Sequence, residues 1–370
     1  MRVAIVHDWL TGMRGGERVL EALLGMFGNA EIFTLVHVPG SVSEDIESHA
    51  IHTSFIDRIP FVESRYRHLL PLFPAAIERF DLRGFDLVVS SSHCVAKGVL
   101  TPPDIPHLCY CHTPMRYVWD QYESYFAPGR ASAAVRVGMR MAAARLRQWD
   151  VETATRPSVI VANSAHVRSR VRDYWQRDSI VVYPPVDVRR FQRSTTREDF
   201  YLAVSALVPY KRLDIAVEAF SRSGRRLIVV GEGPEHARLS RLNGRCTEFT
   251  GRVSDEEVAE LMSRCRAFIL PGEEDFGIAA VEAQATGAPV IALGKGGALE
   301  TVIAADNLSD ASTATGVFFA EPTPDSLGHA LDRFETMSFD ASAIRANAER
   351  FDRDRFVREM KNRLDALLAG

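Results

Sequence analysis

Residues 267–287 read AFILPGEEDFGIAAVEAQATG, a short apolar run followed by an acidic loop and a helical segment. The run over 267–270 is typical of a buried strand, and Gly287 is typical of a helix end. A helix beginning near Gly277 would leave backbone N–H groups unpaired at its start, and glycine lets an anion approach them closely. Because the helix dipole favours negative charge at this end, the stretch predicts a strand–loop–helix unit that binds a diphosphate.

The same alternation of short β-branched runs and helical patterns continues along most of the chain. It predicts βαβ units and parallel sheets, so the expected fold class is α/β with doubly wound sheets. We expect strands at Val3–His7, Glu31–Val36, Leu87–Ser90, His107–Cys111, Val159–Ala162, Ile180–Tyr183, Tyr201–Ser205, Arg226–Val230, Glu248–Thr250, Ala267–Leu270, Pro289–Leu293 and Gly316–Phe319. The clearest helices are expected at Glu17–Met26, Asp214–Ser221, Asp255–Cys265 and Ile278–Thr286.

A chain of 370 residues is long enough for two domains, because single cores stop growing near ~250–300 residues. The best boundary is Tyr183–Asp187, where two prolines fix the backbone and end a strand. We therefore predict an N-terminal domain over 1–184, a C-terminal domain over 185–351 and a last helix at about 352–370. Ligands of such sheets bind beyond the carboxyl ends of the strands, so two facing domains would form a cleft between them.

Composition limits the classes of protein that the chain can belong to. Hydrophobic residues make up 46% and charged residues 25%, which is typical of a globular protein. The formal net charge of −4 argues against a nucleic-acid partner. We expect no membrane span, because no run of ~18 uncharged apolar residues occurs. The five cysteines form no C-x-x-C pair, which indicates reduced thiols and a cytoplasmic protein.

Two glutamates accompany the predicted diphosphate site. Glu282 lies about five residues inside the helix, or ~7.5 Å from its start, which is a suitable reach for a ribose hydroxyl. Glu274 precedes the helix and would lie near whatever group the diphosphate carries. The alternative is an acidic loop and a solvated helical glutamate, both common in α/β proteins.

A second candidate for phosphate binding follows the first strand of the C-terminal domain. Residues 205–214 read SALVPYKRLD, and Lys211 and Arg212 lie on a strand-to-helix loop. Such cations could clamp phosphate oxygens, with arginine capable of a forked contact. The alternative is surface charge at a helix start, although the same domain also holds the predicted anion site.

Two glycine loops follow other strands. Gly231–Pro234 suggests a dinucleotide fingerprint, but Pro234 intrudes and His236 occupies the third glycine position, so we reject that interpretation. The loop is expected to line the cleft instead. Gly15 and Gly16 belong to the matching loop of the N-terminal half, which could approach a phosphate or sugar or simply form a tight turn.

His112 follows the predicted strand His107–Cys111 and enters a proline turn. It could hydrogen-bond a sugar hydroxyl or act as an acid or base, and a structural histidine is the alternative. With His93 and Cys94 the segment offers potential soft metal ligands. The alternation along it is equally that of a buried strand, so we predict no metal site.

A basic region separates the two candidate sites. Between Arg130 and Arg177 ten arginines stand against three acids, a local net charge of +7. The helix expected over 131–149 has one apolar stripe made of Val135, Met139, Ala142, Leu146 and Trp149. Its neighbouring stripe holds Arg136, Arg140 and Arg147. We consider two interpretations: a helix lying on an anionic membrane surface, or a helix packed on its own domain with a solvated basic edge.

The chain resembles the family 4 (group 1) glycosyltransferases over nearly its whole length. The resemblance is carried by Gly15-Gly16, His112, Asn163-Ser164, Tyr183–Asp187, Lys211, Gly231–Pro234, Phe249–Val253, and Glu274 with Glu282. It implies the GT-B architecture of two facing Rossmann-like domains. The run Cys111–Tyr125 and the opening His7-Asp8-Trp9 are most similar to bacterial mannosyltransferases of surface-polysaccharide assembly, which use GDP-mannose.

The resemblance also implies roles for individual residues. Lys211 would neutralise the donor diphosphate, and the N–H groups of Gly277 and Ile278 would hold its distal phosphate. Glu274 and His112 would contact the transferred sugar. Further donor contacts are implied for Gly15, Gly16, Arg212, Gly231, Arg252, Val253, Phe276 and Glu282, with the ribose at Glu282 and the base beside Arg252. Acceptor contacts are expected at Arg116, Tyr117 and Asp120, and the last helix would return to the N-terminal domain.

The implied reaction is a metal-independent transfer of a hexose with retention of anomeric configuration, to a lipid-linked or oligosaccharide acceptor. No cofactor is expected, and the enzyme would be cytoplasmic or peripheral on the inner face of the membrane. One position departs from the family pattern, because Ala206 stands where many members place an arginine. Arg212 would have to replace that cation. Three alternatives remain. The enzyme could use a UDP-sugar donor, or it could be a sugar-nucleotide epimerase or phosphorylase. The protein could also be a non-catalytic nucleotide-sugar sensor or scaffold.

Overall fold

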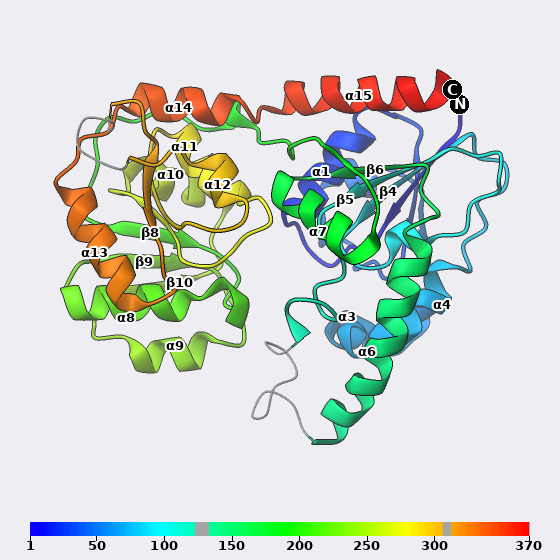
Figure 1. Ribbon diagram of the computed structural model, residues 1–370, viewed down its shortest axis with the longest axis horizontal. Coiled ribbons are helices and arrows are strands. Elements are labelled where there is room, and N and C mark those ends of the chain that lie inside the picture. Colours follow the sequence, from blue (N-terminus) through cyan, green and yellow to red (C-terminus); the bar gives the residue numbers. More distant parts are fainter. Residues whose placement is uncertain (123–132, 306–311, 370) are drawn as a thin grey trace. The chain divides into compact units, whose positions relative to one another are not determined.

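The computed structural model describes residues 1–122, 133–305 and 312–369, with the side chains of 133–135 outside the description. Its contacts divide the chain into two compact units. Unit 1 comprises Met1–Pro185 with Phe356–Gly370, and unit 2 comprises Val186–Arg355 (Figure 1). The predicted boundary segment Tyr183–Asp187 lies where the first unit passes into the second.

Unit 1 is built on a seven-stranded parallel sheet with the order β3-β2-β1-β4-β5-β6-β7. Its strands are β1 (Val3–His7), β2 (Glu31–Thr34), β3 (Ile51–Thr53), β4 (Leu87–Ser92), β5 (His107–Cys111), β6 (Val159–Ala162) and β7 (Ile180–Val181). Its helices include α1 (Gly15–Leu24), α2 (Glu44–Glu47), α3 (Val62–Arg65), α4 (Phe73–Ile77), α6 (Ala133–Thr153), α7 (Ala165–Trp175) and α15 (Arg353–Ala369). The strand order reverses between β1 and β4, where a doubly wound sheet binds its ligands.

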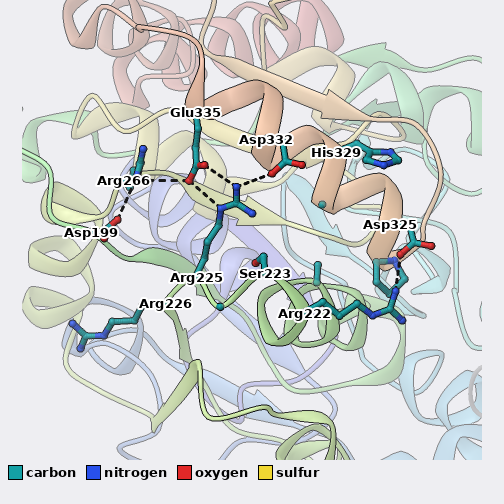
Figure 2. A pocket seen from close by; sticks show the side chains of 14 residues that line it. Asp199, Arg222, Ser223, Arg225, Arg226, Arg266, Asp325, His329, Asp332 and Glu335 are labelled. Carbon is teal, nitrogen blue, oxygen red and sulfur yellow. Dashed lines mark hydrogen bonds and ion pairs between the residues drawn. The ribbon is translucent and has the colours of Figure 1, made fainter.

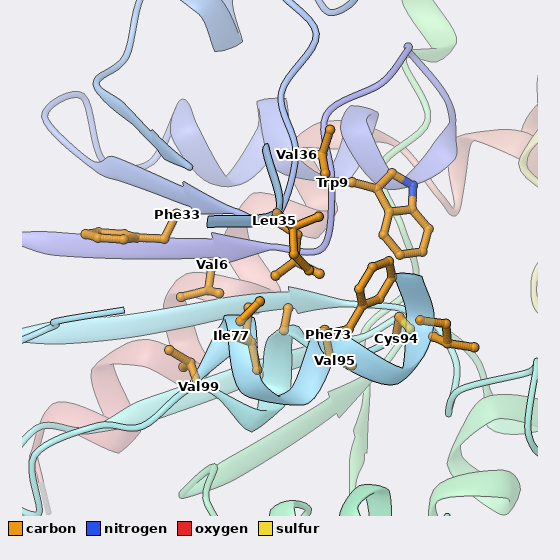
Figure 3. Close-up of a cluster of buried hydrophobic side chains, with 14 of the residues drawn as sticks. Val6, Trp9, Phe33, Leu35, Val36, Phe73, Ile77, Cys94, Val95 and Val99 are labelled. Atoms are coloured by element: carbon orange, nitrogen blue, oxygen red, sulfur yellow. The ribbon is translucent and has the colours of Figure 1, made fainter. Parts of the chain in front are cut away.

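Both faces of this sheet are buried, because successive apolar residues of a strand point to opposite sides. On β1, Ala4 and Val6 belong to a cluster with α3, α4 and α6, part of which is shown in Figure 3. Val3 and Ile5 belong to a second cluster with α1 and with Phe356, Met360 and Leu364 of α15. The last helix therefore contributes to the core of unit 1 from Phe356 onwards.

Unit 2 is a six-stranded parallel sheet with the order β10-β9-β8-β11-β12-β13. Its strands are β8 (Tyr201–Val204), β9 (Leu227–Val230), β10 (Thr247–Gly251), β11 (Phe268–Leu270), β12 (Val290–Leu293) and β13 (Gly316–Phe319). Its helices are α8 (Leu213–Ser223), α9 (His236–Leu242), α10 (Asp255–Arg264), α11 (Ile278–Ala285), α12 (Ala298–Thr301), α13 (Pro324–Glu335) and α14 (Ala341–Glu349). The order reverses between β8 and β11, which places the loops after these two strands at the expected ligand position.

The sequence predictions of secondary structure agree closely with this architecture. Four predicted strands have the observed bounds, namely Val3–His7, His107–Cys111, Val159–Ala162 and Gly316–Phe319, and the other eight differ by a few residues at their ends. β3 was not predicted, because its three residues lie at the sheet edge and two of them are exposed. The expected helix over 131–149 begins outside the described residues, as does the end of the run Cys111–Tyr125.

Candidate functional site

Lys211 and Glu274 lie on the two loops at the switch point of unit 2. Lys211 ends a short 3₁₀ turn (Pro209–Lys211) after β8, and Glu274 lies between β11 and α11. The ammonium Nζ of Lys211 is 2.6 Å from Oε1 and 2.7 Å from Oε2 of Glu274. Both side chains are largely buried, with 21% and 14% of their surface exposed. The predicted phosphate cation and the predicted sugar-binding carboxylate thus form one ion pair.

Close backbone packing holds the two loops together. A methyl group on Gly272 would lie 2.8 Å from the carbonyl oxygens of Tyr210 and Lys211. A methyl group on Gly297, in the loop after β12, would lie 2.4 Å from the Cα of Phe276. The amide of Gly297 also donates to the carbonyl of Glu274 at 2.7 Å. Only glycine fits at these contacts, so the position of the acidic loop is fixed by backbone rather than by side chains.

Gly277 precedes α11, as the sequence predicted, with φ of 92° and ψ of 55°. This left-handed conformation suits glycine and turns the chain sharply into the helix. The carbonyl of Gly277 accepts from Ala280 and Val281 at 3.0 and 3.3 Å. Helix geometry leaves the amides of Ile278 and Ala279 without an intrahelical acceptor, at the positive end of the helix. Gly277, Ile278 and Glu282 are all half-buried, so a ligand can reach this helix start.

The remaining predicted donor residues have different surroundings. Arg212 adopts a left-handed conformation with φ of 51°, and its guanidinium contacts the carboxylate of Asp214 and the carbonyl of Pro322. The replacement of the missing cation at Ala206 by Arg212 stays a prediction. Gly231 packs against the carbonyl of Ser205, on the loop that leads to Lys211. Arg252 is exposed and Val253 half-buried after β10, and Phe276 is buried.

In unit 1, His112 lies after β5 and takes part in a chain of polar contacts. Its Nε2 is 2.8 Å from Oγ of Ser91, and the same oxygen is 3.1 Å from Nδ1 of His7. Nε2 of His7 lies 3.7 Å from Oε1 of Glu17. Burial and the neighbouring His93 and His7 rings lower the pKa of His112 to about 3, so its ring is neutral at pH 7. The predicted role of His112 as an acid or base therefore has to work from the neutral ring.

Gly16 covers this chain of contacts. A methyl group built on Gly16 would lie 3.6 Å from Cε1 of His7 and 3.9 Å from Nε2 of His112. The predicted glycine loop and the predicted histidine are thus neighbours in unit 1, together with Gly15 at the start of α1. The sequence pattern does not connect His7, Glu17 and Ser91 with His112. A polar residue directly after or at the end of a buried strand was the available signal for His7 and Ser91.

Asp8 is a further buried polar residue of this unit, for which the sequence pattern predicted no contact. Its buried carboxylate accepts the backbone amides of His93, Cys94, Val95 and Ala96 at 2.6–2.9 Å. Nδ1 of His93 lies 3.2 Å from the same carboxylate. The carboxylate therefore binds the loop after β1 to the loop after β4, which supports the polar chain beside it.

Of the residues considered as metal ligands, His107, Cys109 and Cys111 are buried in β5. All five cysteines are free thiols. Burial raises the pKa of the Cys109 thiol to about 12 and lowers the pKa of His107 to about 3. Nε2 of His107 is 2.8 Å from Oγ of Ser90. Within the described ranges, His, Cys, Asp and Glu side chains form no group of three or more suited to a metal ion.

The residues expected on the acceptor side lie at the start of the segment after β5. Arg116 and Tyr117 are half-buried, and Tyr117 packs against the core of unit 1. Asp120 forms an ion pair with Arg170 of α7. Arg170 also donates to Oγ1 of Thr113 at 3.2 Å. Asp120 is therefore held by α7.

The basic helix α6 packs on its own unit. Met139, Leu146 and Trp149 of the predicted apolar stripe join the core cluster of unit 1, and Val135 lies outside the described side chains. These three side chains are therefore not available to a bilayer. For them, the helix is packed on its own domain, which is the second of the two interpretations. Arg147 donates to the carbonyl of Val118 and lies over the Trp119 ring. Arg140 is exposed and Arg136 half-exposed, so membrane contact by these two stays a prediction.

A cavity of about 960 Å³ opens elsewhere in unit 2. It is lined by residues just before β8, β9 and β11 and by α13, so it lies at the amino ends of the strands, away from Lys211. In Figure 2 several of its charges are paired: Arg225 contacts Asp332 and Glu335 at 2.7 Å, and Arg266 contacts Asp199 at 3.0 Å. Hydrogen bonds from Arg225 hold the pKa of Glu335 below its ordinary value. These ion pairs join side chains of the cavity wall to one another.

None of the helices in the described part of the chain combines the length and apolar character needed to cross a bilayer. This finding concerns these helices alone.

Comparisons with known proteins agree with the fold. The sequence model of the family "Glycosyltransferase Family 4" matches residues 13–190. That of the family "Glycosyl transferases group 1" matches residues 187–351. An uncharacterised glycosyltransferase of Methanocaldococcus jannaschii is 30% identical over 154 residues, covering 40% of this chain and 44% of the relative. A GDP-mannose-dependent alpha-(1-6)-phosphatidylinositol dimannoside mannosyltransferase of Mycobacterium tuberculosis is 32% identical over 161 residues, covering 42% and 39%.

The matched segments thus span less than half the length of these relatives. Among solved structures, the Anabaena protein HepE in complex with UDP has a TM-score of 0.68 at 16% identity, covering 99% of this chain and all of the other. Together the two family models cover almost the whole chain from residue 13 to residue 351. The chain therefore belongs to the family 4 (group 1) glycosyltransferases, with two parallel-sheet domains of the GT-B fold.

Proposed function

We propose that this chain transfers a mannosyl group from GDP-mannose to a lipid-linked or oligosaccharide acceptor, with retention of anomeric configuration and without a metal ion. The observation that carries this proposal is the Lys211–Glu274 pair beside the start of α11. A cation and a helix start favour a diphosphate, while a carboxylate a few residues away suits the group that the diphosphate carries. The similarity to GDP-mannose-dependent relatives supports the choice of donor.

The proposed chemistry follows from charge. Breaking the anomeric bond leaves negative charge on the nucleotide diphosphate and positive character on the sugar. The Lys211 ammonium and the amides of Ile278 and Ala279 stabilise the first, so they favour the transition state over the bound donor. When the diphosphate binds, Lys211 exchanges contacts with Glu274 for contacts with phosphate. Glu274 is then available to hydrogen-bond hydroxyls of the sugar. Glu282, further along α11, binds the ribose.

We infer that unit 1 supplies the contact of His112 with the transferred sugar. The neutral ring can hydrogen-bond a hydroxyl without repelling the positive character that develops on the sugar. Acceptor contacts at Arg116, Tyr117 and Asp120 belong to the same proposal. Peripheral attachment to the inner face of a cytoplasmic membrane, through Arg136 and Arg140, would bring a lipid-linked acceptor within reach.

The experiment is a transfer assay with labelled GDP-mannose and a lipid extract from the source organism as acceptor. Lys211→Ala and Glu274→Ala should each lower turnover ~10²–10³-fold, the usual effect of losing one charge-stabilising group. Lys361→Ala and Glu256→Ala, at exposed positions on α15 and α10, are the matched controls and should leave transfer unchanged. Full transfer by both site variants would overturn the assignment. The anomeric configuration of the product, read by NMR, tests retention.

A UDP-sugar donor is the second candidate, because the structure of the similar Anabaena protein contains UDP. A panel of GDP- and UDP-sugars scored by thermal shift separates the two donors. Conversion of the donor without an acceptor would instead indicate an epimerase. Tight binding without conversion or transfer would indicate a sensor.

A further inference from the structure

His112 is the last member of a chain of four side chains in unit 1. The chain runs from the carboxylate of Glu17 to Nε2 of His7 at 3.7 Å, from Nδ1 of His7 to Oγ of Ser91 at 3.1 Å, and from Oγ of Ser91 to Nε2 of His112 at 2.8 Å. His7 and Ser91 have no exposed surface, and Glu17 is 3% exposed. His112 alone is part-exposed.

Each link of this chain restricts where its neighbour can carry a proton. A serine hydroxyl has one proton, so Ser91 can donate to only one of the two rings and must accept from the other. Glu17 is an acceptor that receives the amide of Arg14 at 3.0 Å through its other oxygen. Its carboxylate repels a lone pair on Nε2 of His7 and attracts an N–H there, although 3.7 Å is too long for a direct hydrogen bond.

With the proton of His7 on Nε2, its Nδ1 is a lone pair and accepts the hydroxyl proton of Ser91. The oxygen of Ser91 must then accept from Nε2 of His112. We propose that Glu17 sets the tautomer of His112 through His7 and Ser91, so that His112 carries its proton on Nε2 and presents Nδ1 as a hydrogen-bond acceptor to a hydroxyl of the transferred sugar. The sugar part of this inference rests on the proposed function, whereas the tautomer does not.

The surroundings of His112 agree with this assignment. Among the described residues, the hydrogen-bond partner of His112 is at Nε2, and Nδ1 is not among the buried atoms that lack a partner. Nδ1 therefore reaches solvent or ligand. Asp8 does not compete for the His7 ring, because its oxygens receive four backbone amides and face His93. Glu17 is thus a positioning residue, with no contact to substrate of its own.

The direct test is the tautomer of His112, read from the ¹⁵N and ¹³C shifts of the ring in histidine-labelled protein at neutral pH. The wild type should carry the proton on Nε2. Glu17→Gln should move the proton of His112 to Nδ1. The amide oxygen of the glutamine keeps the contact with Arg14, so its N–H₂ group faces His7. Each hydrogen bond from His7 to His112 then reverses its direction. Glu21→Gln, one turn further along α1, is the matched control and should leave the shifts unchanged.

Two further results decide the proposal. Once Ser91→Ala has cut the chain, Glu17→Gln should no longer move the proton of His112. A wild-type ring with its proton on Nδ1 would overturn the proposal without any variant, so a variant that fails to fold does not leave it untested. The same tautomer in folded wild type and Glu17→Gln would also overturn it.

Donor analogues test the hydroxyl contact. Dissociation constants are measured for GDP-mannose and for analogues in which one sugar hydroxyl is replaced by hydrogen or by fluorine. The hydroxyl that contacts His112 is the one whose removal weakens binding to wild type but not to His112→Ala. Fluorine cannot donate, so wild type should bind the fluoro analogue no better than the deoxy analogue. In Glu17→Gln the fluoro analogue should instead bind more tightly than the deoxy analogue, because Nδ1 then carries a proton that fluorine can accept. An unchanged order overturns the sugar contact. Failure of every nucleotide sugar to bind overturns the proposed function while the tautomer result stands.

Discussion

Lys211 donates to both carboxylate oxygens of Glu274, at 2.6 and 2.7 Å, so the cation and the carboxylate of the candidate site satisfy each other. The two residues come from loops 63 positions apart that meet at the switch point of one sheet. A diphosphate at Lys211 must therefore compete with Glu274.

This competition predicts opposite effects on nucleotide binding. Lys211→Met should weaken GDP binding about 10- to 100-fold, the effect of losing a charge-assisted contact. Glu274→Gln should leave GDP binding unchanged or tighten it, because Lys211 loses a competing charge, while sugar transfer falls. Titration calorimetry with GDP checks both. Equal weakening by the two substitutions would show that Glu274 binds the nucleotide itself.

The glycine contacts predict that the acidic loop tolerates no added methyl group. Gly297→Ala would place Cβ 2.4 Å from the Cα of Phe276, so the loop must shift and transfer should fall ~10²-fold. Gly328→Ala in α13 meets nothing within 4 Å and is the matched control. That control should keep full activity and gain about 0.5–1 kcal/mol of stability. Normal kinetics in Gly297→Ala would show that the loop position does not matter.

Two histidines with lowered pKa values predict loss of stability in acid. Burial lowers the pKa of His107 and of His112 to about 3, against an ordinary value of 6.5. Between these values the unfolded chain binds protons that the folded chain does not, so unfolding is favoured as pH falls. Each ring should lower the free energy of unfolding by about 2 kcal/mol at pH 5. His107→Gln should flatten the pH dependence measured by urea unfolding, whereas His68→Gln, at an exposed position, should not.

Asp8 predicts a strong stability effect outside the donor site. In Asp8→Asn, the amide N–H₂ would face two of the four backbone amides that the carboxylate accepts. Each unsatisfied buried amide costs about 1–3 kcal/mol, so unfolding free energy should fall by about 2–6 kcal/mol. Asp81→Asn, at an exposed position, is the control. A change below 1 kcal/mol in Asp8→Asn would mean that the two loops are held by other contacts.

The orientation of α6 predicts which of its arginines contact an anionic membrane surface. Arg140 is exposed beside Val137 and Met141, whereas Arg147 lies over Trp119. Arg136→Ala with Arg140→Ala should lower co-sedimentation with anionic vesicles, and added salt should weaken the wild-type binding. Arg147→Ala should have little effect on vesicle binding. Unchanged binding by the double variant would exclude this membrane role.

Much of this architecture could be predicted because its signals are local. Buried parallel strands such as Leu227–Val230 are continuous apolar runs, and Gly277 marks the helix start directly. The two switch points follow from strand order, which the sequence pattern does not state. The Lys211–Glu274 pair and the chain from Glu17 to His112 join residues far apart in sequence, so no spacing reveals them. Membrane contact by Arg147 was one of two interpretations, because helix periodicity places this residue on a stripe without showing what packs there.

The most direct measurement is the free energy of unfolding with and without GDP-mannose, in wild type and in Lys211→Met. Wild type should gain ~2.7 kcal/mol at 100 times the dissociation constant, and the variant should gain little at that same concentration. The same stabilisation in both proteins, or none by any GDP- or UDP-sugar in wild type, would contradict a donor diphosphate bound between Lys211 and the start of α11.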